Sequence, residues 1–308
     1  MPGPLEGLRV IDVGALIAGP WAATTLADQG ADVIKVERPG VGDLFRHVGS
    51  NRGGMSGMFH VLNRGKRSLA VDLANPKGVE VFLALAATAD VIVQNLRPGV
   101  VDRIGIGYEQ VKEQREDIVY LSLSGFGSKG PYAHKRVYDN VIQTYSGLAD
   151  AQMNPTTGEP EFLRQLLTDK LTAWAGAQAV TAALLGRALG RGGQHIEMSM
   201  LDTAVAFMWP DRAGDRILLG EGINEQPPLG PNFQLLPLAD GFGTVTAFAD
   251  SEFTGLCKAL ELHEIAADPR FANTAARMEN LDLVTRAYRD AIGPAASKLT
   301  REEFERRL

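Results

Sequence analysis

The 308-residue chain contains little cysteine and little excess positive charge. Its single cysteine, Cys257, excludes an intrachain disulfide and a zinc site built from cysteines, and it is compatible with a reducing cytoplasm. The net charge of −6 argues against a general nucleic-acid-binding protein, which usually has a basic face. The opening residues MPGPLEG lack the basic and apolar regions of a signal peptide. These absences favour a cytoplasmic protein that binds neither nucleic acid nor a membrane.

Long hydrophobic runs are also missing. The longest uncharged run, residues 171–186, is rich in alanine and contains Gln178, and it is too short to span a bilayer comfortably. It is therefore interpreted as a core helix. Apolar residues make up 45% of the chain and charged residues 22%, as is ordinary for globular proteins, and the length suffices for two domains.

Residues 8–37 predict a strand, a helix and a second strand. The β-branched run 8–13 ends at Gly14, Pro20 suits a first helical turn, and a helix over residues 22–29 stops at Gly30 before the run 31–37. Such a βαβ unit is right-handed and places its strands in a parallel sheet. The alternation continues with a helix at 76–88, a strand at 90–96, a helix at 108–115 and a strand at 117–124.

The predicted fold class is therefore α/β, with a Rossmann-like doubly wound parallel sheet and a second, smaller α/β domain. We expect the large domain over residues 1–213, a linker rich in glycine and proline over 214–231, and the small domain over 232–308. The small domain is expected to contain two strands within 234–249 and helices at 252–262 and 281–292. A capping box at Thr300 and Glu303, with a staple of Leu299 and Phe304, opens its last helix.

Ligands of such sheets bind at the carboxyl ends of the strands, so two function classes compete here. A dinucleotide-dependent oxidoreductase would use Glu37 to bind a ribose, but the segment from Gly14 to Gly19 lacks the GxGxxG spacing that the pyrophosphate turn needs. Glu37 is then interpreted as a surface acid at a strand end. The alternative is another enzyme with a nucleotide-containing ligand, in which arginines beside the strand ends bind phosphates through their planar fork.

An ordered series of motifs resembles the class III coenzyme A transferases, the family of formyl-CoA transferase that also includes α-methylacyl-CoA racemase. The motifs are AGP at 18–20, GADVIKVE at 30–37, Gly42-Asp43 with Arg46, NRGKRS at 63–68, NLRPG at 95–99, SGFG at 124–127 with Gly130-Pro131, and GGQ at 192–194 running into SMLD at 199–202.

The resemblance implies that CoA and acyl-CoA bind as substrates, with no permanently bound cofactor and no metal. The CoA-contacting positions of the family correspond to Ile17, Ala18, Arg38, Asn95, Leu96, Arg97, Arg103, Arg136, Val137, Tyr138 and Asp139. The resemblance also implies an interlocked homodimer whose chains continue past residue 308, so the chain is expected to be incomplete at its C-terminal end.

Asp169 stands at the start of the alanine-rich helix. Taken alone, the residue pattern favours a helix N-cap. The resemblance instead identifies Asp169 as the acyl-accepting carboxylate, which attacks a thioester to give a mixed anhydride and then an aspartyl-CoA thioester. The helix N-terminus is expected to keep this carboxylate ionised.

Two alternatives to the transferase remain open. A racemase of the same family needs a histidine where this chain has Tyr138, and His134 is out of register, which favours the transferase. The other alternative is a catalytically silent CoA-binding protein. The glycine-rich loop that shields the anhydride in many transferases corresponds only to residues 220–222 and 229–232. Asp202 is interpreted as a helix cap, and Trp174, Phe207 and Trp209 as core or interface residues.

Overall fold

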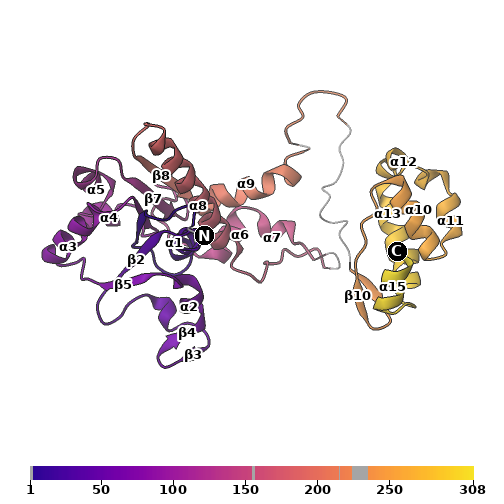
Figure 1. Ribbon diagram of the computed structural model, residues 1–308. Helices are drawn as coiled ribbons and strands as arrows, with labels where there is room; N and C mark the ends of the chain where they lie inside the picture. The colour runs from indigo at the N-terminus through magenta and orange to yellow at the C-terminus, as the bar shows by residue number, and fades with distance from the viewer. Residues whose placement is uncertain (1–2, 155–156, 215, 224–234) are drawn as a thin grey trace. The chain divides into compact units, whose positions relative to one another are not determined.

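The computed structural model describes residues 3–154, 157–214, 216–223 and 235–308 (Figure 1). The chain divides into one compact unit within residues 1–209 and another within residues 210–308. Of the predicted linker, residue 215 and residues 224–231 lie outside the described residues, as do residues 229–232 of the segment that corresponds to the shielding loop of other transferases.

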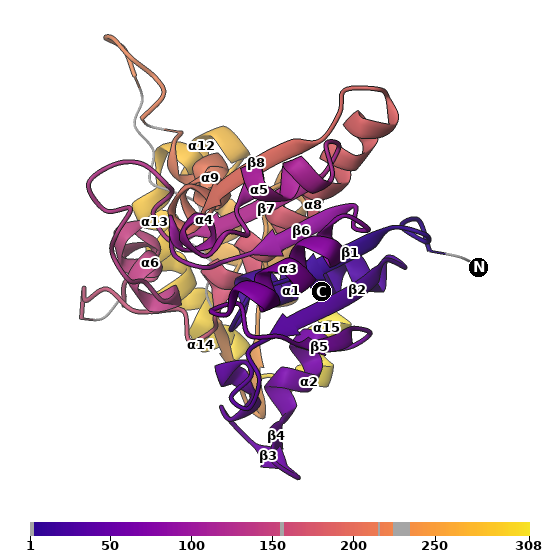
Figure 2. The same cartoon turned by 90° about the vertical axis from the view of Figure 1, so that its left-hand side faces the viewer.

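The first unit is built on a six-stranded sheet in the order β5-β2-β1-β6-β7-β8, and every neighbouring pair of strands is parallel. Figure 2 shows the strands in this order. The predicted α/β class with a doubly wound parallel sheet is thus confirmed. The strands are β1 (Arg9–Asp12), β2 (Asp32–Glu37), β5 (Arg67–Ala70), β6 (Val91–Gln94), β7 (Val119–Ser124) and β8 (Gln194–Ser199).

Helices cover both faces of this sheet because successive side chains of a strand point to opposite faces. Val10, Val93 and Leu121 pack against α1 (Ala18–Asp28) and α8 (Leu167–Ala188). Ile11 and Tyr120 face the other layer, in which Figure 1 shows α3, α4 and α5 on the opposite side of the strands from α8. These three helices span Pro76–Ala86, Val100–Ile104 and Tyr108–Gln114.

Two local differences from the sequence prediction affect the site. Helix α1 begins at Ala18, four residues before the predicted start, because a first turn tolerates Pro20 without its N–H. The segment predicted as a loop at 40–58 instead contains short ordered elements, and Ser56 caps the helix that follows it. These elements are η1 (Leu44–Arg46), β3 (Asn51–Arg52), β4 (Met55–Ser56) and α2 (Gly57–Asn63).

The first unit also contains α6 (Asp139–Tyr145), α7 (Leu148–Ala151) and residues 200–209 of α9 (Met200–Arg212). Trp174, Phe207 and Trp209 are 52%, 54% and 56% exposed, so their interpretation as core residues is wrong, and a role at an interface stays a prediction. In the part of the chain that the structure describes, no helix has the length and apolarity needed to cross a membrane.

The second unit has its own apolar core, formed around an antiparallel hairpin of β9 (Leu236–Leu238) and β10 (Gly241–Gly243). The predicted box at Thr300 is present as a cap, since its hydroxyl accepts the Glu303 N–H at 3.2 Å, and both Leu299 and Phe304 are buried. The helix predicted over 281–292 is α13 followed by a π-helical turn. The helical elements are α10 (Asp250–Ala259), α11 (His263–Ala267), η3 (Pro269–Phe271), α12 (Thr274–Glu279), α13 (Leu281–Ala287), η4 (Tyr288–Ile292), α14 (Gly293–Ala296) and α15 (Arg301–Arg307).

Candidate active site

A cavity of about 420 Å³ opens at the carboxyl edge of the sheet, in the first unit. It lies among the segments that follow β1, β6 and β7 and the first turn of α8. Segments far apart in the sequence therefore meet at one place, as the parallel topology requires. The predicted site residues that line this cavity are Ala18, Asn95, Leu96, Arg97, Arg136, Val137, Tyr138 and Asp169.

Asp169 is the third residue of α8 and not its cap. The N-cap position belongs to Leu166, which makes no side-chain capping bond, so the N-cap interpretation of Asp169 is wrong. The start of the helix is instead bound by Asp139, whose carboxylate accepts the Thr168 hydroxyl at 2.9 Å and the Asp169 backbone N–H at 3.0 Å. Gln143 donates to the other Asp139 oxygen at 2.6 Å.

Burial, with the negative charge of Asp139 as the second cause, raises the pKa of Asp169 to about 7. The helix N-terminus therefore does not keep Asp169 fully ionised at neutral pH, contrary to the expectation. A helix dipole contributes up to about 2 kcal/mol, whereas a rise of about three pKa units corresponds to about 4 kcal/mol. The site therefore holds a carboxyl group that changes charge near physiological pH.

Positive charge lines the same cavity. Arg97 follows β6, and Lys135 and Arg136 precede α6. The Lys135 ammonium lies 3.6 Å from the centre of the Tyr132 ring, whereas the exposed guanidinium groups of Arg97 and Arg136 have no hydrogen bond or ion pair within the described ranges. Two arginines without protein partners are suited to hold an anionic ligand.

Four predicted residues lie away from this cavity. Arg38 is exposed at the end of β2 and Arg103 is exposed on α4, and neither lines the cavity. The carboxylate of Asp139 is buried and bound to protein groups, as described above. Ile17 lines a second hollow, of about 510 Å³, together with Trp21, Met58, Leu166 and Lys170.

The two hollows share their backbone walls. Ala18 and Asp169 line the first hollow, while their chain neighbours Ile17 and Lys170 line the second. The first turn of α1 and the first turn of α8 therefore separate a cationic cavity from a more apolar groove. Trp21, which lines the groove, has a buried Nε1 atom without a hydrogen-bond partner within the described residues.

The sequence-based interpretations of Glu37 and Asp202 are also wrong. Glu37 is buried rather than a surface acid, and its two oxygens accept from Arg46 at 2.8 and 2.6 Å. This arginine holds the pKa of Glu37 low, against the opposing effect of burial. Asp202 is not a cap, because the Ser199 hydroxyl accepts the Asp202 N–H at 2.9 Å.

A buried charge cluster below the loop after β1 was not identified from the sequence. It consists of Asp12, Lys35, Asp43 and Lys66, whose side chains are at most 2% exposed. Its signal was the presence of Asp12 and Lys35 next to buried apolar residues of their strands, since buried charges must be paired.

The chain was compared with known proteins. The sequence model of CoA-transferase family III matches residues 5–308. The chain is 35% identical over 288 residues to the succinate–glutarate CoA-transferase of Agrobacterium fabrum, covering 89% of this chain and 71% of that protein. It is 34% identical over 302 residues to the acetyl-CoA:oxalate CoA-transferase of Acetobacter aceti, covering 96% of this chain and 77% of that protein.

A solved structure agrees with these sequences. The crystal structure of a CaiB/BaiF family protein from Brucella suis superimposes with a TM-score of 0.82 at 33% identity, covering 99% of this chain and 81% of that one. The resemblance inferred from the ordered motifs is confirmed. The chain belongs to CoA-transferase family III.

Proposed function

We propose that this protein transfers CoA from an acyl-CoA donor to a carboxylic acid, with Asp169 as the acyl acceptor. The observation that carries the proposal is one carboxyl group, with a pKa of about 7, that shares a cavity with Arg97 and Arg136. The family relatives described above are named for CoA transfer between acids, which supports the same reaction class here.

The proposed reaction has four steps. The ionised Asp169 oxygen attacks the thioester carbonyl carbon, the C–S bond breaks, and a mixed anhydride and CoA thiolate form. The thiolate attacks the Asp169 carbonyl carbon and releases the donor acid as its carboxylate. The acceptor carboxylate then attacks the aspartyl thioester and frees the thiolate again. In the last step the thiolate attacks the acceptor carbonyl carbon and restores the Asp169 carboxylate.

The arrangement suits these steps in two ways. A raised pKa makes Asp169 a more basic carboxylate than a solvated one, at the cost of being only about half ionised at pH 7. Arg97 and Arg136 provide exposed guanidinium groups for the phosphates of CoA, and the resemblance adds Arg38 and Arg103 as further candidates. CoA is a substrate in this proposal and no permanent cofactor is needed.

The same cavity is proposed to hold the acid that exchanges with Asp169. Leu16, Leu96 and Met200 line it and would contact methylene groups, and Lys135 would meet the distal carboxylate of a dicarboxylic acid. The names of the two relatives include succinate, glutarate and oxalate, all dicarboxylic acids.

The test is a panel of acyl-CoA thioesters with free acids, in which CoA exchange is followed by mass spectrometry. We expect exchange in the wild-type protein and none in Asp169→Ala, which should still bind CoA. A racemase would instead introduce deuterium at the α-carbon without exchange, and a silent binder would do neither. Light scattering tests the further expectation of a homodimer.

A further inference from the structure

The loop between β1 and α1 contains a residue in a rarely used conformation. Leu16 has a φ of +64°, in the left-handed region that side chains with a Cβ seldom adopt. Leu16 also lines the cavity that contains Asp169. Strained backbone at such a place needs surrounding groups that hold it.

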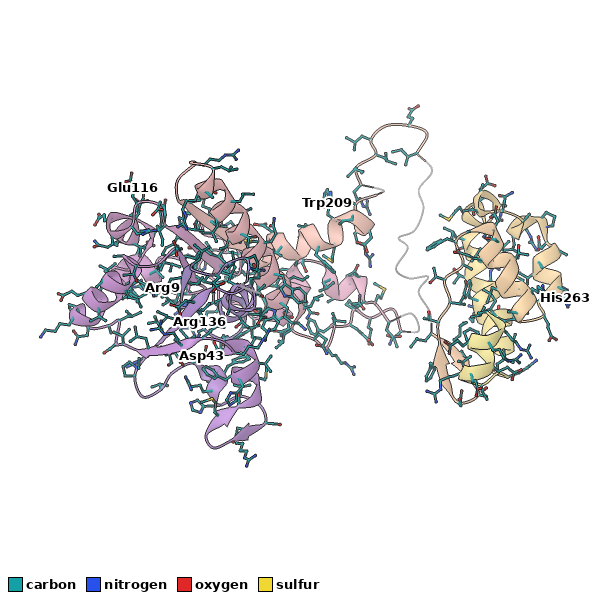
Figure 3. All side chains as sticks on the ribbon, in the orientation of Figure 1. Arg9, Asp43, Glu116, Arg136, Trp209 and His263 are labelled. Atoms are coloured by element: carbon teal, nitrogen blue, oxygen red, sulfur yellow. The ribbon has the colours of Figure 1, made fainter. Side chains whose placement is uncertain are left out.

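Two side chains from distant segments bind this loop. Both carboxylate oxygens of Asp43, which is labelled in Figure 3, accept the Leu16 N–H, at 3.2 and 3.1 Å. Asn95 binds both backbone groups of Ala15, the residue before Leu16. The Asn95 Oδ1 accepts the Ala15 N–H at 2.7 Å, and the Asn95 Nδ2 donates to the Ala15 carbonyl at 2.8 Å. The amide of Asn95 is therefore engaged with the protein, although Asn95 lines the cavity.

The buried charge cluster supports Asp43 from below. The Lys35 ammonium donates to the Gly14 carbonyl at 2.5 Å and to Asp43 at 3.2 Å, and Asp12 pairs with Lys66 at 2.7 Å. Buried ion clusters of this kind can often be replaced by apolar side chains without loss of stability. Stability alone therefore does not account for this cluster, and Asp12, Lys35 and Asp43 each bind the backbone of residues 14–16.

The loop is closely packed where it enters α1. A Cβ at Gly19 would lie 2.9 Å from the Asn95 Oδ1 and 3.0 Å from the Gly14 Cα. The loop leads into α1 with Leu16 and Ala18 on the wall of the Asp169 cavity.

We propose that Asp43 and Asn95 are positioning residues, which hold Leu16 in its left-handed conformation and so fix the wall that Leu16 forms in the Asp169 cavity for acyl transfer. This inference rests on the proposed function. It assigns Asn95 a role inside the protein instead of the CoA contact that the resemblance implies. Misplacing a reacting group by about 1 Å can cost about 100-fold in rate, so the loop is expected to affect kcat more than binding.

The first test is Asp43→Asn. This change replaces one carboxylate oxygen of Asp43, which accepts a hydrogen bond from the Leu16 N–H or the Lys35 ammonium, by an amide nitrogen that cannot accept one. We expect kcat for CoA exchange to fall about 30-fold or more while the KM for the acyl-CoA donor changes less than about 3-fold. Asp90→Asn is the matched control, because Asp90 also binds a backbone N–H, that of Arg9 at 2.8 Å, and a cation, Arg187 at 2.9 Å, away from the cavity. This control should lower the melting temperature and leave kcat within about 2-fold.

The second test changes Leu16 itself. Leu16→Val keeps the carboxylate network but places a β-branched residue at positive φ, so it should reproduce the loss of kcat. Leu16→Gly, combined with Asp43→Asn, should restore kcat at least about tenfold over Asp43→Asn alone, because glycine adopts positive φ without the Cβ penalty. Should Asp43→Asn fail to fold, Leu16→Val in the wild-type background carries the test, and a kcat within about 3-fold of the wild type overturns the positioning role.

Hydrogen exchange separates this inference from the proposed function. The amides of residues 14–18 should exchange at least about tenfold faster in Asp43→Asn than in the wild type, and not in Asp90→Asn. A wild-type protein that does not transfer CoA would contradict the proposed function. The amide exchange rates would still show whether Asp43 holds the loop in place. Unchanged exchange in Asp43→Asn, or a kcat within about 3-fold of wild type, overturns the positioning role.

Discussion

The raised pKa of Asp169 predicts that its negative charge destabilises the folded protein. Replacing Asp169 by Asn removes this charge and no side-chain hydrogen bond seen in the described residues. An aspartate has a pKa of about 3.9 in an unfolded chain, and that of Asp169 is about 7 in the fold. Between these two values the folded state binds the additional proton, so wild-type stability falls as pH rises through this window.

At about 1.36 kcal/mol per pKa unit, this linkage costs the wild type about 1.5 kcal/mol at pH 5 and about 4 kcal/mol at pH 8. The Asp169→Asn variant does not incur this cost. Its free energy of unfolding in urea, minus that of the wild type, should therefore be about 2 to 3 kcal/mol larger at pH 8 than at pH 5. Asp150→Asn, at an exposed aspartate, controls for the general loss of one negative charge. An Asp169→Asn difference that is the same at both pH values would refute the burial argument.

Three further predictions follow from single contacts. Arg136→Ala should weaken CoA binding about tenfold in calorimetry, since a charge-assisted hydrogen bond contributes about 1.5–3 kcal/mol, and an unchanged dissociation constant would exclude a phosphate contact. Lys135→Met should raise the KM for a dicarboxylic acid acceptor about tenfold with little change for a monocarboxylic acid, and equal effects on both would contradict the proposed contact. Arg277→Met should destabilise the second unit by about 2–4 kcal/mol in urea unfolding, because the buried Arg277 donates to the carbonyls of Phe271 at 3.1 Å and Phe248 at 2.7 Å. A loss below about 0.5 kcal/mol would show that these carbonyls find other hydrogen-bond donors.

Hydrophobic patterning was sufficient to predict the four central strands of the sheet. The β-branched runs that end at Gly14 and at Glu37 are strands β1 and β2, and they pair in parallel with Ile11 opposite Ile34. The parallel topology predicted a ligand site at the carboxyl ends of the strands, and the family resemblance of the ordered motifs identified Asp169 as part of that site. These features depend on local periodicity and on connection handedness, which a sequence carries directly.

The errors arose where a distant residue determines a local structure. Asp169 was interpreted as a cap because aspartate often caps helices, but Asp139, thirty residues earlier, binds the start of α8 instead. The same carboxylate contributes to the raised pKa of Asp169, which the helix dipole argument alone predicts with the wrong sign. Glu37 was interpreted as a surface acid since its bond to Arg46 depends on a loop that has no periodic pattern.

The central claim is that Asp169 carries the acyl group, and trapping that adduct tests it most directly. The protein would be incubated with an acyl-CoA donor and hydroxylamine, digested, and analysed by mass spectrometry, with Asp169→Asn as the control. Hydroxylamine intercepts an anhydride or a thioester, so the account predicts a hydroxamate on Asp169 that forms faster as pH rises through about 7. CoA exchange without any modification at Asp169, or normal exchange in Asp169→Asn, would contradict it.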